Sequence, residues 1–116
     1  MCARIFHNPR CSKSRATLAL LKESVSEIEV VEYLVTPPAV EELETICQML
    51  GVEPIDIIRT KDSLFSELGL SAGDSRSRVE WLRILAGSPG LLERPIVVYK
   101  GRAAVGRPPE NVLGIL

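Results

Sequence analysis

The sequence has no excess of charge of either sign. Its 116 residues include 14 Lys and Arg against 15 Asp and Glu, which leaves a formal net charge of −1. A domain that binds nucleic acid usually carries a clear basic surplus or patch, so no nucleic-acid partner is indicated. The apolar runs are far too short to cross a bilayer, and the first residues lack the apolar core of a signal peptide. We therefore expect a cytoplasmic protein with no membrane partner.

Cysteines are few and unpaired in their spacing. Cys2, Cys11 and Cys47 are the three present, an odd number that argues against a disulfide scaffold and fits a reducing compartment. No two of them, and no cysteine with the single His7, have the spacing of a closed zinc site. Neither a bound metal nor a tightly bound cofactor is therefore expected.

Two familiar cysteine motifs are also absent around Cys11. A Cys-x-x-Cys dithiol would need a second cysteine at position 14, where Ser14 stands. A phosphatase-type loop would need an arginine six positions after the cysteine, where Thr17 stands. Any disulfide formed at Cys11 must therefore be resolved by a thiol from outside the loop.

The segment that is present, His7 to Arg15, is the most informative of the chain. It places Cys11 between a short apolar run and a helical pattern that begins near Ser12. A thiol at the start of a helix faces the positive end of the helix dipole, which stabilises the reactive thiolate. Lys13 and Arg15 add positive charge, so a reactive role for Cys11 is favoured over a buried structural one.

The order of predicted elements indicates an α/β fold. Hydrophobic periodicity and turn residues predict strands at 3–7, 27–33, 95–99 and 102–106, and helices at 12–24, about 39–50, 54–59, 63–68, 75–86 and from 108 onward. The β-α-β start and the closing β-β-α would form a four-stranded mixed sheet with a right-handed crossover. This is the order of the thioredoxin-like fold. We expect one domain, residues 1–116, with a helical insertion at about 37–90.

The other two cysteines have simpler interpretations. Cys47 falls on the apolar face of its helix, beside Leu43 and Ile46, and is expected to be a buried structural thiol. Cys2 precedes the first strand and is expected to have no role beyond exposure to oxidation. In the helix at 75–86, Val79, Leu82 and Leu85 or Ala86 are expected to face inward.

Three arginines are candidates for binding an anion, since forked guanidinium donors match tetrahedral oxyanions. Arg94 and Arg107 each directly precede a proline, which restricts their backbone to extended conformations. Arg59 closes a short apolar helical segment. For any one surface arginine a solvated charge is the simpler interpretation.

Five segments resemble glutaredoxin-linked arsenate reductases in order along nearly the whole chain: HNPRCSKSRATLALL, YLVTPP, IIRTKDSLFSELGL, ERPIVV and GRPPENVLGIL. The resemblance implies a thioredoxin-like fold and reduction of arsenate to arsenite, with glutathione as co-substrate and glutaredoxin as partner. It implies that Cys11 is catalytic and that Arg59, Arg94 and Arg107 bind the oxyanion. His7, Ser14, Arg15 and a characteristically cis Pro95 would support the thiol.

Other functions remain open from the residues. A general glutathione-dependent thiol-disulfide oxidoreductase would need Cys11 but not three arginines. A redox-responsive regulator that binds RNA polymerase would share the RPIVV segment but normally uses the Cys-x-x-Cys switch that Ser14 removes. A binding module with an inert thiol is a third alternative.

Overall fold

A computed structural model describes residues 2–116 of the chain. Its contacts divide into two compact units. One contains the described residues up to Thr36 together with Arg94–Leu116, and the other is Pro37–Glu93. None of the helices in the described part combines the length and the apolarity that a membrane crossing requires.

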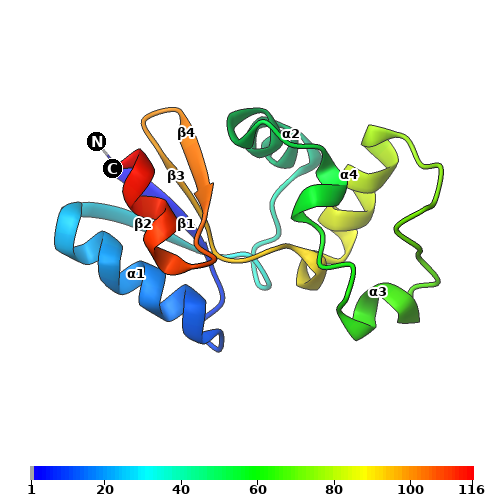
Figure 1. Ribbon diagram of the computed structural model, residues 1–116, viewed down its shortest axis with the longest axis horizontal. Helices are drawn as coiled ribbons and strands as arrows, with labels where there is room; N and C mark the ends of the chain where they lie inside the picture. The colour runs from blue at the N-terminus through cyan, green and yellow to red at the C-terminus, as the bar shows by residue number, and fades with distance from the viewer. Residues whose placement is uncertain (1) are drawn as a thin grey trace. The chain divides into compact units, whose positions relative to one another are not determined.

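The first unit is built on a four-stranded mixed sheet in the order β2-β1-β3-β4 (Figure 1). Its strands are β1 (Cys2–His7), β2 (Glu27–Glu32), β3 (Ile96–Tyr99) and β4 (Arg102–Val105). β1 pairs parallel with β2 and antiparallel with β3, which pairs antiparallel with β4. Lys100 and Gly101 join the last two strands with φ values of 52° and 74°, the left-handed geometry that a two-residue hairpin turn requires. The fold class predicted from sequence is confirmed.

Two helices, α1 (Ser12–Ser24) and the 3₁₀ helix η3 (Pro109–Ile115), pack against this sheet. The core between them contains Ile5, Leu21, Val97, Val112 and Ile115, all under 10% exposed. Burying side chains of this size stabilises the unit by roughly 1.5–3 kcal/mol each relative to exposure. One apolar cluster therefore holds α1 and η3 against the sheet, and it contains residues from the first and the last segments of this unit.

One end of each of the four strands lies at the same edge of the sheet. His7, the last residue of β1, pairs with Glu32 at the end of β2. Phe6 pairs with Ile96 at the start of β3, which pairs with Val105 at the end of β4. The residues that follow or precede these pairs therefore gather at the same edge, where α1 also begins.

The second unit is helical. It contains α2 (Val40–Leu50), the 3₁₀ helix η1 (Pro54–Ile57), α3 (Ser63–Glu67), α4 (Arg78–Gly87) and the 3₁₀ helix η2 (Pro89–Leu91). Gly51 ends α2 with φ +70°, as expected of a left-handed C-cap. Phe65 stacks on Trp81 with ring centroids 6.2 Å apart. Cys47 is fully buried in this unit, as predicted.

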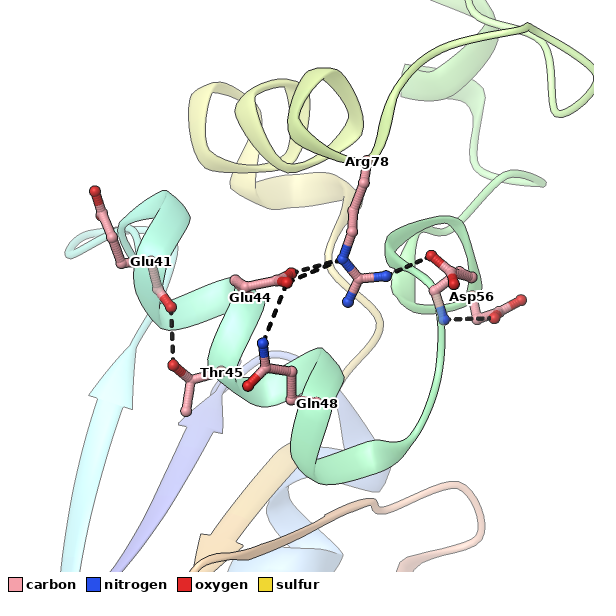
Figure 2. A network of polar contacts seen from close by, with 7 residues as sticks. Glu41, Glu44, Thr45, Gln48, Asp56 and Arg78 are labelled. Atoms are coloured by element: carbon pink, nitrogen blue, oxygen red, sulfur yellow. Dashed lines mark hydrogen bonds and ion pairs between the residues drawn. The ribbon is translucent and has the colours of Figure 1, made fainter.

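Arg78, at the start of α4, ties three helical segments of this unit together (Figure 2). Its Nε donates to both carboxylate oxygens of Glu44 on α2, at 2.9 and 3.0 Å, and its Nη1 donates to Glu53 just before η1. Gln48 donates to the same Glu44 carboxylate at 3.3 Å. These hydrogen bonds hold the pKa of Glu44 below its usual range.

One expectation about an inward face was wrong. Val79 is 46% exposed because α4 begins only at Arg78, and its buried stripe consists of Trp81, Leu82 and Leu85. In η3, the expected helix is a 3₁₀ helix, and Leu113 is 49% exposed while Val112 and Ile115 are buried. The tighter 3₁₀ winding places every third residue on one face.

Candidate active site

Cys11 is the N-cap residue of α1. Its backbone N–H donates to the Asn8 carbonyl at 3.0 Å, and its own carbonyl accepts from the Arg15 N–H at 3.0 Å. This turn presents the thiol to the first backbone N–H groups of the helix, which have no partner within the helix itself. The side chain is half-buried, so the sulfur is both held and accessible.

The electrostatic surroundings of the Cys11 thiol favour the thiolate. Burial by itself would raise the pKa of Cys11, but the backbone N–H groups of Ser14 and Lys13 and the Arg94 guanidinium outweigh it and lower the pKa below its ordinary value. Hydrogen bonds to the charged form stabilise that form. The backbone N–H groups in the first turn of α1 therefore help to stabilise the Cys11 thiolate, as the sequence predicted.

Arg94 and Arg107 are both brought to Cys11 by the sheet edge described above. The Arg107 Nη2 lies 4.0 Å from the Cys11 sulfur, and its Nε donates to the Arg94 carbonyl at 2.7 Å. The carbonyl of Arg107 in turn accepts from Asn111 Nδ2 at 3.0 Å. The guanidinium of Arg107 is therefore held in a fixed orientation beside the thiol.

His7 and Ser14 form a buried pair next to this turn. His7 Nδ1 and Ser14 Oγ are 2.6 Å apart, and the same oxygen accepts from the Asn8 N–H at 3.0 Å. Burial is the main cause of a lowered His7 pKa; Glu32 opposes it, and Arg15 and Lys22 lower the pKa further. The imidazole is thus neutral at pH 7, and the pair fixes the loop that leads to the thiol.

Arg15 supports the same loop from outside, since its Nη1 donates to the Pro9 carbonyl at 2.9 Å.

The segment before β3 is fixed by a close backbone approach. The Arg94–Pro95 peptide is cis, as the resemblance implied, and the Arg107–Pro108 peptide is cis as well. The Gly106 N–H donates to the Pro95 carbonyl at 2.8 Å. A Cβ on Gly106 would lie 2.5 Å from Thr17 Oγ1 and 2.8 Å from Pro95 Cγ. Sequence reasoning missed Gly106, although its place directly before Arg107 was a signal.

Arg59 lies in the second compact unit. There its Nη1 contacts a Glu93 carboxylate oxygen at 3.3 Å, and its Nε lies 3.6 Å from an Asp62 oxygen. Its backbone N–H donates to the Leu91 carbonyl at 2.7 Å. The role of Arg59 as an oxyanion ligand stays a prediction from sequence.

The remaining thiols are not equivalent to Cys11. Burial raises the pKa of Cys47 to about 11, so it is unreactive at neutral pH. Cys2 is exposed and begins β1, five residue steps or about 16 Å of strand from His7. Within residues 2–116, no three His, Cys, Asp or Glu side chains converge as metal ligands would.

A thioredoxin-like sheet with a single activated cysteine at the start of its first helix defines the class of this protein. The chain belongs to the ArsC family, whose model matches residues 6–115. It is 51% identical over 114 residues to an arsenate reductase of Neisseria meningitidis serogroup A, with 97% of each chain covered. It is 47% identical to the uncharacterised Escherichia coli protein YfgD, covering 97% of this chain and 95% of that one. Among solved structures, an arsenate reductase from Vibrio cholerae superposes with a TM-score of 0.92 at 48% identity, covering 100% of this chain and 98% of that one.

Proposed function

We propose that this protein reduces arsenate to arsenite with Cys11 as its single nucleophile, glutathione as co-substrate and glutaredoxin as partner. The observation that carries the proposal is the convergence of the Arg94 and Arg107 guanidinium groups on an activated Cys11 thiol. Membership of the ArsC family and the arsenate reductases among its relatives support arsenate as the oxyanion.

In the first step, the Cys11 thiolate attacks arsenic(V). An As–S bond forms and an As–O bond breaks, and the departing oxygen takes up protons and leaves as water. Arg94 and Arg107 stabilise the negative oxygens, as do the N–H groups at the start of α1. Arg59 is retained as a third ligand on the resemblance alone.

In the second step, the glutathione thiolate attacks the Cys11 sulfur. The S–S bond forms as the As–S bond breaks, and the electron pair of the broken bond stays on arsenic, which leaves as arsenite. Glutaredoxin then attacks the glutathione sulfur of the mixed disulfide and releases the Cys11 thiolate. An external thiol is required because Ser14 replaces a second loop cysteine and Cys47 is buried.

The room for such a co-substrate lies beside the loop that leads to Cys11. A cavity of about 520 Å³ opens there, large enough for a tripeptide. It is lined by His7, Asn8, Pro9, Arg10, Glu32, Leu34 and Val35. A reaction that consumes glutathione also fits a reducing cytoplasm, where we place the protein as part of this proposal.

The test is arsenate-dependent oxidation of NADPH in a coupled assay with glutathione, glutathione reductase and glutaredoxin. Cys11→Ser should abolish turnover because serine is a far weaker nucleophile and leaving group, while circular dichroism shows an unchanged fold. Cys2→Ser, which changes an exposed thiol, is the matched control and should keep full activity. Residual turnover in Cys11→Ser would reject the proposal. Turnover of a small disulfide but not of arsenate would identify a general thiol-disulfide oxidoreductase instead.

A further inference from the structure

Tyr33 carries a buried hydroxyl that no described residue satisfies. The side chain is 0% exposed, and its hydroxyl oxygen has no hydrogen-bond partner among residues 2–116. Buried polar groups in native proteins almost always have a partner, and an unpaired one is destabilising. An apolar phenylalanine would avoid this cost, so the hydroxyl needs an explanation other than packing.

The sheet register places Tyr33 at the same edge as the candidate active site. It directly follows Glu32, which pairs with His7, so Tyr33 lies alongside Asn8. Two residues before β3, Arg94 continues the same edge on the other side of β1. The side chains of Asn8 and Arg94 lie in hydrogen-bonding range of the Tyr33 hydroxyl but without the geometry of a hydrogen bond, and the charges of Arg94 and Cys11 also act on it.

A second unpaired donor lies in the same place. The Arg94 Nε is also buried and has no hydrogen-bond partner in the described chain. Burial, the largest influence, raises the pKa of Tyr33 despite the opposing effects of Arg94 and Asn8, so the hydroxyl keeps its proton at neutral pH. Two donors beside a nucleophilic thiol require an acceptor, and a tetrahedral oxyanion supplies acceptor oxygens on every side.

We infer that Tyr33 is a substrate-contacting residue whose hydroxyl donates a hydrogen bond to an oxygen of the oxyanion held by Arg94 beside Cys11. The inference rests on the proposed function for the position of the oxyanion. The hydroxyl is then satisfied only when substrate is bound. The buried Tyr33 hydroxyl therefore serves substrate binding and does not add to the stability of the fold.

Tyr33→Phe separates the two roles because it removes only the oxygen. We expect kcat/KM for arsenate to fall about tenfold, or about 1.4 kcal/mol, mainly through KM. We expect the melting temperature to stay the same or to rise, because the variant no longer buries an unpaired group. Unchanged kinetics, or a loss of activity that is matched by a lowered melting temperature, would overturn the inference.

Tyr99→Phe is the matched control. Tyr99 ends β3 and pairs with Arg102, at the opposite edge of the sheet from Cys11, so its kinetics should equal those of the wild type. The rate of Cys11 alkylation by iodoacetamide across pH should also be unchanged in Tyr33→Phe. A shifted alkylation profile would show that the hydroxyl acts through the thiol and would overturn direct contact with the oxyanion.

Protection of Cys11 from iodoacetamide by arsenate makes the test independent of turnover. If the wild-type protein does not reduce arsenate, the proposed function fails. The arsenate concentration that halves the alkylation rate of Cys11 (half-protection) would still measure oxyanion binding. A higher arsenate concentration for half-protection in Tyr33→Phe than in wild type supports the inference. Equal concentrations, or no protection of the wild-type thiol, would overturn it.

Discussion

At the scale of single residues, Gly106 has no room for a side chain. Gly106→Ala places a Cβ 2.5 Å from Thr17 Oγ1, and Thr17 cannot give way because it is fully buried and donates to the Lys13 carbonyl at 2.8 Å. We expect overpacking to cost about 1–3 kcal/mol of unfolding free energy, measured by urea denaturation. Gly114→Ala, where nothing lies within 4 Å of the added Cβ, should cost far less. Equal losses in the two variants would contradict the close approach.

The Cys11 thiolate gives a second prediction at this scale. Because the folded protein lowers the Cys11 pKa, the rate of alkylation by iodoacetamide should reach half its maximum below the roughly pH 8.5 of a free thiol. Arg94→Ala removes a positive neighbour that favours the thiolate, so the midpoint should move to higher pH. Arg102→Ala, an exposed position on β4, is the control and should leave it in place.

These residues differ in how far sequence reveals them. Cys11 was evident because strand, thiol and helix are adjacent in the chain. Arg94 and Arg107 were marked by the prolines that follow them, and in the structure both lie beside the Cys11 thiol. Tyr33 gave no such signal, because a tyrosine at the end of a predicted strand is ordinary until the pairing of Glu32 with His7 brings it to the same edge.

At the scale of elements, the start of α4 depends on a capping box. The Ser77 hydroxyl accepts from the Glu80 N–H at 3.2 Å, and the Glu80 carboxylate accepts from the Ser77 N–H at 3.1 Å. We expect Ser77→Ala to lower the unfolding free energy by about 1 kcal/mol in urea denaturation. Ser77→Asp retains an acceptor and should restore most of the loss. A neutral Ser77→Ala would show that the cap does not contribute.

The starts of α1 and α4 show which helix boundaries the sequence could predict. α1 was expected over about 12–24 and occupies Ser12–Ser24, because Cys11 and a continuous helical pattern define its start. α4 was expected from Ser75, and the periodicity of its apolar residues could not show that Ser77 caps it and that Val79 stays exposed. Local hydrogen bonds at helix ends set such boundaries, and apolar spacing does not record them.

At the scale of the whole molecule, oxyanion binding should stabilise the fold by mass action. A ligand that binds only the native state adds about 2.7 kcal/mol when its free concentration is 100 times Kd. We expect arsenate to raise the melting temperature of Cys11→Ser, which cannot react, in a concentration-dependent way. Adding Arg107→Ala to this variant should weaken the rise, since Arg107 lies 4.0 Å from the sulfur position. A rise that is equal in both proteins would exclude Arg107 as a ligand.

The element order along the chain was enough to predict the mixed sheet, because short connections and right-handed crossovers leave few arrangements. The contact of Arg59 with Glu93 was not predictable, since side-chain pairing across 34 positions leaves no periodic trace in the sequence.

The long separation in sequence between Cys11 and Arg107, which meet at one sheet edge, also bears on how the protein is made. Cys11 leaves the ribosome well before Arg94 and Arg107, because the contact between Cys11 and Arg107 spans 96 positions. The nascent thiol therefore lacks the guanidinium groups that accompany it in the finished protein. Arg94 lowers the Cys11 pKa only once it has been synthesised and the sheet has formed, so the thiol of a nascent chain is less reactive than that of the folded protein.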